Sequence, residues 1–314
     1  MKLLDQVQFG FIGGFPSPDE AKATVEIAEQ LNFDSLWVGD HVAFPVPILD
    51  SLMQLALASA YSSKLVLGTC VFLLPLRNPT VVAKQVATLD RMTGGDRVIF
   101  GVGIGGEFPN EYVACGVDVH ERGARLSAGI PALKTLWKDE EVSYDSEFYK
   151  FDKVRMLPAP PTVGGPPIWC GGRAKSALKR AARIADGYVS YAVNAPMFAD
   201  SLKQIEQEFE RTGRQQDFGT GHLLFIRIDK DFESAHKVAT KYLSQRYAMD
   251  FSKPAKKYSA LGTPADVAEV ISGYYEAGVR HFVLDLVGPM AERQAQLEQF
   301  ANEVRPLLSF SNKA

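Results

Sequence analysis

The sequence is short of cysteine, and its three cysteines lie far apart. Cys70, Cys115 and Cys170 form no C-x-x-C pair in a chain of 314 residues. Disulfide frameworks and zinc clusters need cysteines at close, regular spacing. We therefore expect neither a disulfide scaffold nor a metal site, and we expect a protein of the reducing cytoplasm.

Long apolar runs and an excess of one charge are also absent. No window reaches the ~18 consecutive apolar residues that a membrane-spanning helix needs. The first six residues hold one lysine followed by acid and amide side chains, unlike a secretory signal peptide. The net charge of −3 gives no attraction to nucleic acid or anionic membranes. The expected partner is a small-molecule substrate.

Short β-rich apolar runs instead alternate with helical patterns along the whole chain. The eight predicted strands cover residues 9–12, 35–38, 65–71, 97–102, 168–170, 188–189, 222–228 and 279–286. Such alternation implies a parallel sheet covered by helices. An open doubly wound sheet alternates in the same way, but a count of eight favours a closed (β/α)8 TIM barrel. We predict one α/β domain over residues 1–314.

Two connections are longer than a simple βα rhythm requires, so the barrel should carry insertions after strands four and seven. The first holds a helical pattern in which Pro131 predicts a kink or a restart near Ser127, then a hairpin pattern over residues 142–151. The second contains residues 245–261, which read as a long loop with basic and aromatic side chains. Loops of this length are usually functional or disordered, so we predict a mobile lid.

Active sites of such barrels lie where strands end and the following loops begin. Residues 101–106 match G-x-G-x-x-G directly after a strand, but Pro109 argues against an immediate helix and hence against a dinucleotide fingerprint. The alternatives are a glycine floor that a flat ring can approach closely, or an ordinary flexible loop.

A second glycine pair, Gly171 and Gly172, precedes an alanine-rich helix and is followed by Arg173. Free N–H groups, the helix dipole and the guanidinium together would suit a cofactor phosphate, although an ordinary βα turn has the same appearance. His41 follows Asp40 at the end of the second strand and is the candidate for proton transfer. The alternative is a structural histidine bonded to a carbonyl.

Together these segments resemble the luciferase-like superfamily, which contains FMN-dependent monooxygenases and oxidoreductases dependent on the deazaflavin coenzyme F420. The resemblance covers nearly the whole chain. The matching runs are SLWVGDH (35–41), LGTCV (67–71), PLRNP (75–79), FGVGIGGE (100–107), PIWCGGR (167–173), ADGY (185–188), GTP (262–264) and EAGV (276–279).

The resemblance implies a cofactor ring in the barrel mouth with His41 at its reactive edge. It implies a non-prolyl cis peptide between Cys70 and Val71. The cofactor contacts it implies are Asp40, Cys70, Val71, Glu107 and Asn110, with a phosphate near Cys170, Gly171, Gly172, Arg173 and Ala174. Phe11 and Phe44 should shape the substrate pocket.

The choice of cofactor stays open at this point. We expect a monooxygenase that uses O2 and reduced FMN, supplied by a partner flavin reductase, on a small organic substrate, and we expect a homodimer. The PLRNP run and the Gly-Gly-Glu run, in contrast, look like F420-dependent members, so an F420-dependent oxidoreductase is the alternative. A rival of another class is a non-catalytic flavin-binding barrel. A lysine-dependent aldolase is disfavoured because no predicted strand ends in lysine.

Overall fold

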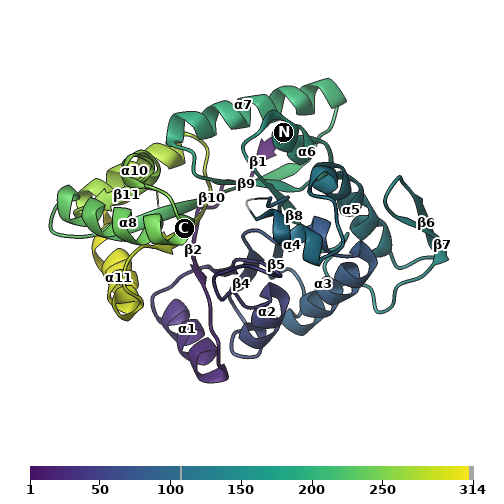
Figure 1. The fold of residues 1–314 in the computed structure, drawn as a ribbon, viewed down its shortest axis with the longest axis horizontal. Coiled ribbons are helices and arrows are strands. Elements are labelled where there is room, and N and C mark those ends of the chain that lie inside the picture. The colour runs from purple at the N-terminus through teal and green to yellow at the C-terminus, as the bar shows by residue number, and fades with distance from the viewer. Residues whose placement is uncertain (107, 311–314) are drawn as a thin grey trace.

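Eight parallel strands close into a ring in the computed structural model, which describes residues 1–106 and 108–310. The order is β2, β3, β4, β5, β8, β9, β10 and β12, and β12 pairs back with β2. Helices surround this ring (Figure 1). The predicted (β/α)8 barrel is therefore confirmed.

All eight predicted strands are present, with ends shifted by a few residues. Their bounds are β2 (Gln8–Gly13), β3 (Ser35–Val38), β4 (Val66–Thr69), β5 (Val98–Val102), β8 (Ile168–Gly171), β9 (Gly187–Tyr191), β10 (Asp217–Ile228) and β12 (His281–Leu286).

The structure contains four further strands. β6 (Val142–Asp145) and β7 (Lys150–Val154) form the predicted antiparallel hairpin. β1 (Lys2–Leu3) pairs with the start of β10, and β11 (Ser259–Gly262) pairs with its end. Because β11 belongs to the sheet, the end of the predicted lid segment is not a loop.

Eleven α-helices are found in the described residues, and most of them follow a barrel strand. They are α1 (Pro18–Gln30), α2 (Ser51–Ser59), α3 (Pro79–Thr93), α4 (Pro109–Ala114), α5 (Arg122–Leu136), α6 (Lys175–Ile184), α7 (Ala195–Thr212), α8 (Phe232–Tyr247), α9 (Ser252–Tyr258), α10 (Pro264–Glu276) and α11 (Arg293–Gln299). Short 3₁₀ turns cover Leu74–Leu76, Val119–Glu121, Met290–Glu292 and Arg305–Leu307, and a π turn covers Phe300–Val304.

Two expectations based on proline, a helix restart near Ser127 and no helix directly after the glycine run, are wrong. α5 runs without interruption through Pro131, so no restart occurs near Ser127. α4 begins at Pro109, directly beyond the glycine run. A proline in the first turn removes an N–H group that has no partner inside the helix, and its fixed φ suits that position.

Two tryptophans fill part of the barrel interior. Trp37 and Trp169 lie 5.9 Å apart between ring centroids, and His281 meets both edge-on. A Cβ at Gly68 would lie 2.3 Å from Trp37, and one at Gly187 would lie 2.4 Å from Trp169. Glycine is therefore required where the indoles cross neighbouring strands, and the barrel interior is a packed core rather than a pore.

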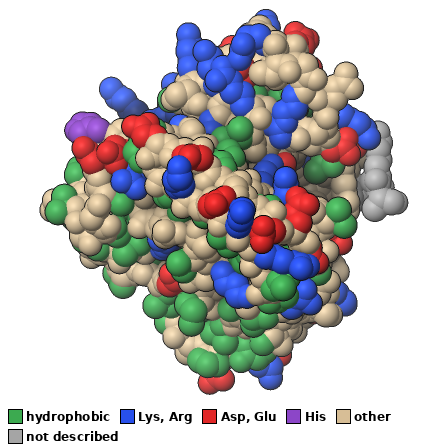
Figure 2. Space-filling view, turned by 90° about the vertical axis from the view of Figure 1, so that its right-hand side faces the viewer, with side chains coloured by type: hydrophobic (Ala, Val, Ile, Leu, Met, Phe, Trp, Pro, Cys, Tyr) green, Lys and Arg blue, Asp and Glu red, His purple; other side chains and the backbone are tan. Residues whose placement is uncertain are grey.

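The outer surface carries mixed charge. Lys, Arg, Asp and Glu side chains are interspersed across the middle of the face shown in Figure 2, in keeping with the small net charge. None of the helices in the described ranges is long and apolar enough to cross a membrane.

Candidate functional site

Four consecutive strands of the ring bring most of the predicted site residues to one rim. β3, β4, β5 and β8 lead at their carboxyl ends into His41, Val71, Gly103 and Gly171. Segments more than 100 residues apart in the sequence are thus neighbours in space. This rim is the end at which barrels of this type place their active sites.

His41 stands between a carboxylate and an aromatic ring. Its Nδ1 lies 3.0 Å from Oε2 and 3.2 Å from Oε1 of Glu111. The imidazole stacks on Phe44, with centroids 3.8 Å apart and planes 14° from parallel, and Phe108 meets Phe44 edge-on. The His41 side chain is 21% exposed and that of Glu111 is 1% exposed. One edge of the imidazole is therefore held while part of the ring stays accessible.

Asp40 belongs to a different network. Its carboxylate accepts two hydrogen bonds from Arg77, at 2.7 and 2.9 Å, and one each from the Ser51 hydroxyl and the Leu73 backbone. Asp40 is 4% exposed. With these four bonds the carboxylate braces the loops after β3 and β4 against each other. Its acceptor positions are taken up by this chain's own groups.

The peptide bond between Cys70 and Val71 is cis, as the resemblance implies. The Val71 side chain faces glycines on the next two strands of the ring. A Cβ at Gly103 would lie 2.4 Å from its Cγ2, and one at Gly171 would lie 3.0 Å from its Cγ1. Burial, with the charge of Asp285, raises the pKa of the Cys70 thiol to about 12. Cys70 is therefore a neutral thiol near pH 7 and not a nucleophile.

The loop from β8 to α6 has the form that an anion site requires. Gly172 has φ of +121°, and a Cβ there would lie 2.7 Å from the Cβ of Ala177. Ala174 caps α6 without a side-chain hydrogen bond, so the first N–H groups of the helix meet no capping side chain. Gly172, Arg173 and Ala174 are exposed.

Arg173 turns toward α7 and donates to the Ala192 carbonyl at 3.1 Å. It also lines a surface depression of about 410 Å³ together with Met197 and Asp200 of α7. The guanidinium thus lies beside the start of α6 but is already anchored by the end of β9.

Two predicted side chains, those of Phe11 and Cys170, are not brought to this rim. Phe11 is fully buried between the barrel and the outer helices, where it meets Phe33 edge-on at 5.0 Å. The buried Cys170 side chain joins the same outer core, so its backbone alone faces the loop. Asn110 lies exposed in the first turn of α4. Glu107 lies outside the described residues.

The opposite half of the rim carries an ion pair that sequence reasoning missed. Asp285 ends β12 and binds Arg246 of α8, with one N–O distance of 2.5 Å and another of 3.3 Å. Tyr247 stacks on Phe251 and packs near Tyr191. The charge of Asp285 also contributes to the raised pKa of the Cys70 thiol. No sequence motif links α8 to β12.

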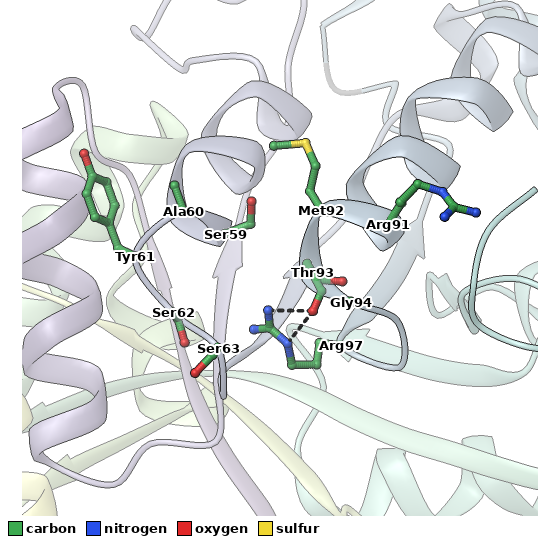
Figure 3. Close-up of a pocket in the computed structure, with 10 residues that line it drawn as sticks. All are labelled: Ser59, Ala60, Tyr61, Ser62, Ser63, Arg91, Met92, Thr93, Gly94 and Arg97. Atoms are coloured by element: carbon green, nitrogen blue, oxygen red, sulfur yellow. Dashed lines mark hydrogen bonds between the residues drawn. The ribbon is translucent and has the colours of Figure 1, made fainter. Parts of the chain in front are cut away.

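A larger depression, of about 510 Å³, lies at the opposite end of the barrel between the loops that follow α2 and α3 (Figure 3). Its polar groups bond to the chain itself: Arg97 donates to the Thr93 and Leu65 carbonyls, and Arg91 donates to Ala159. This depression is separate from the candidate site at the carboxyl ends of the strands. Among the described residues, no three His, Cys, Asp or Glu gather closely enough to hold a metal.

The fold and the rim define a class: a parallel (β/α)8 barrel that carries a histidine and a series of glycines at the carboxyl ends of its strands. The chain belongs to the luciferase-like monooxygenase family, whose model matches residues 4–302. It is an oxidoreductase of this family, which sets aside the non-catalytic alternative.

Known proteins resemble the chain along its whole length. An F420-dependent glucose-6-phosphate dehydrogenase of Nakamurella multipartita is 29% identical over 93% of both chains. Among solved structures, an F420-dependent secondary alcohol dehydrogenase in complex with an F420-acetone adduct has a TM-score of 0.84 at 20% identity, covering 96% of this chain and 99% of that one. The monooxygenase RslO1 of Streptomyces bottropensis has a TM-score of 0.81 at 22% identity, covering 95% and 99%. At these identities the two structures establish the fold only.

Proposed function

We propose that the chain is an F420-dependent oxidoreductase that transfers a hydride between the deazaflavin and a small organic substrate. The observation that carries the proposal is the full-length similarity to an F420-dependent glucose-6-phosphate dehydrogenase. A second relative of the same name, from Kineococcus radiotolerans, is 28% identical over 90% of both chains. This similarity favours an F420-dependent oxidoreductase over the first expectation, a monooxygenase that uses reduced FMN and O2. An F420-dependent enzyme requires no partner flavin reductase.

The residues present fit a flat ring with a phosphate-bearing tail. Val71 packs against Gly103 and Gly171, positions at which any Cβ would displace it, so the floor of the mouth stays flat. The exposed start of α6 offers N–H groups and the positive end of a helix dipole to a phosphate. We assign the ring to the first region and the phosphate to the second.

When bound, F420 supplies the ring carbon that accepts or releases the hydride. His41 of this chain then handles the accompanying proton. As an alcohol is oxidised, its O–H proton passes to the imidazole, and it returns when a carbonyl is reduced. Phe44 stacks on one face of the imidazole and excludes water from that side, and Phe108 packs edge-on against Phe44.

Cofactor titration tests the proposal directly. The purified protein should bind F420 more tightly than FMN when each is added alone. Gly172→Ala should weaken F420 binding by about tenfold, a loss of about 1.4 kcal/mol, because a Cβ would displace the start of α6. Gly213→Ala is the matched control. Gly213 also has positive φ, +65°, but meets no neighbour and lies at the far end of α7. Equal affinities in the two folded variants would contradict the phosphate assignment.

A further inference from the structure

Glu111 is a buried carboxylate with no lysine or arginine within ion-pair distance in the described part of the chain. Its Oε1 accepts hydrogen bonds from the backbone N–H groups of Val42, at 2.5 Å, and Ala43, at 3.3 Å. Its carboxylate also lies within hydrogen-bond distance of Nδ1 of His41, at 3.0 Å for Oε2 and 3.2 Å for Oε1. A carboxylate that is 1% exposed needs N–H donors around it. The imidazole is therefore one of three donors on which this charge depends.

We propose that Glu111 is a positioning residue that fixes the tautomer of His41. An ionised carboxylate accepts hydrogen bonds and cannot donate them, so the hydrogen of the neutral imidazole must sit on Nδ1. The lone pair then lies on Nε2, at the edge of the ring away from Glu111. The catalytic meaning of this arrangement rests on the proposed function, in which Nε2 is the atom that takes the substrate proton.

The neighbouring acid does not share this role. Asp40 is adjacent to His41 in sequence, but its oxygens bind Arg77, Ser51 and the Leu73 backbone. Among residues 1–106 and 108–310, the charged group in contact with the imidazole is Glu111 from α4, and one residue away lies the Asp40–Arg77 pair, whose charges offset each other. Glu111 is the carboxylate that contacts His41.

A purely structural reading of Glu111 is the alternative, since the same carboxylate also holds the turn that leads to Phe44. The two readings differ in what Glu111→Gln does. In this variant the amide oxygen would keep the Val42 and Ala43 bonds. The amide NH₂ would then stand 3.0 Å from Nδ1, where it can donate. The shape is preserved, but the favoured hydrogen position on the imidazole moves from Nδ1 to Nε2.

The test is a long-range ¹H–¹⁵N NMR spectrum of the ¹⁵N-labelled full chain, with the His41 signals identified by their loss in His41→Gln. The neutral wild-type ring should show Nδ1 as the hydrogen-bearing nitrogen, and Glu111→Gln should show Nε2. A wild-type ring with its hydrogen on Nε2 overturns the proposal, even if Glu111→Gln does not fold. The result does not depend on which cofactor binds, so a failure of the F420 assignment is seen separately in the titration.

Turnover gives the second readout. Glu111→Gln should lower kcat by about 10²-fold, within the range of lost acid–base help, with F420 affinity nearly unchanged. Glu121→Gln, which removes an exposed carboxylate paired with Arg125, is the matched control and should leave kcat unchanged. A kcat equal to that of the wild type in a folded Glu111→Gln protein would return Glu111 to a structural role.

Discussion

His41 and Asp40 are adjacent in the sequence but belong to separate hydrogen-bond networks. The pattern Asp-His at a strand end predicts His41 as the site's histidine and suggests Asp40 as its acid. In the structure the acid in contact is Glu111, 70 residues further on. A carboxylate on a two-turn helix beyond a glycine run has no distinguishing spacing, so only the three-dimensional arrangement identifies it.

Replacement of His41 tests its role most simply. His41→Ala should reduce turnover by about 10²–10⁴-fold, because general acid–base help of this size is lost. F420 affinity should fall much less, since the floor and the phosphate loop remain. His41→Gln should recover part of the loss if hydrogen bonding contributes. Steady-state turnover beside cofactor titration measures both effects, and near-normal turnover in His41→Ala would remove the residue from the mechanism.

Phe11 shows the limit of residue-level prediction. It lies on the first barrel strand, and successive strand residues point to opposite faces. Gly10 faces the interior, where a Cβ would collide with Ser35, so Phe11 faces the outer helices. The apolar run of β2 contains no alternation that would reveal this, because both faces of a barrel strand are buried.

At the level of elements, strand positions are predicted well and connections are not. Strands are recognisable in the sequence as apolar runs, whereas the basic stretch that reads as a loop forms α9 and is followed directly by β11. Phe251 and Ala255 are buried against the barrel, and Ser259–Gly262 pairs with β10. The buried aromatic rings of this insertion outweigh its charged exterior in deciding its structure.

We still predict that part of this insertion moves over the mouth, but within residues 248–258 rather than 245–261. The Arg246–Asp285 ion pair ties the last turn of α8, directly before this segment, to the end of β12. Burial lowers and the Asp285 charge raises the pKa of Arg246, with a net rise. Asp285→Asn removes this attraction and should speed hydrogen exchange in 248–258 by about tenfold, which corresponds to about 1.4 kcal/mol.

Asp217→Asn, which breaks an exposed pair with Lys2, is the control and should not alter exchange in that segment. If residues 248–258 exchange as slowly as the barrel strands in the wild type, both with and without cofactor, the lid interpretation fails.

At the scale of the whole molecule, the closed barrel can be predicted from the sequence, because a count of eight strand–helix units favours a closed sheet. The side-chain packing around its strands does not follow from the count. His222 lies within β10 and stacks on Tyr274 of α10, and His281 begins β12 and meets both tryptophans edge-on. Burial lowers the pKa of each to about 3.

These buried histidines predict a pH-dependent stability. Their folded pKa lies below the value of about 6.5 expected when unfolded, so the unfolded chain binds more protons. Their contribution to stability is complete above pH ~6.5 and is lost as the pH falls toward 3, at about 1.4 kcal/mol per pH unit for each histidine.

Urea unfolding at a series of pH values between 7.5 and 5 measures this slope. His222→Phe should reduce it by about one proton, because the ring can still stack on Tyr274. His120→Gln, at an exposed position, should leave it unchanged. A His222→Phe slope equal to that of the wild type would contradict the neutral buried state of His222.

The central claim is that this barrel transfers hydride with F420. The most direct measurement is loss of the oxidised deazaflavin absorbance when the purified protein is mixed with F420 and a panel of secondary alcohols and sugar phosphates. We predict substrate-dependent reduction of F420 that His41→Ala slows by about 10²-fold or more. Oxygen uptake with reduced FMN on a substrate, with no reduction of F420 by any member of the panel, would contradict it.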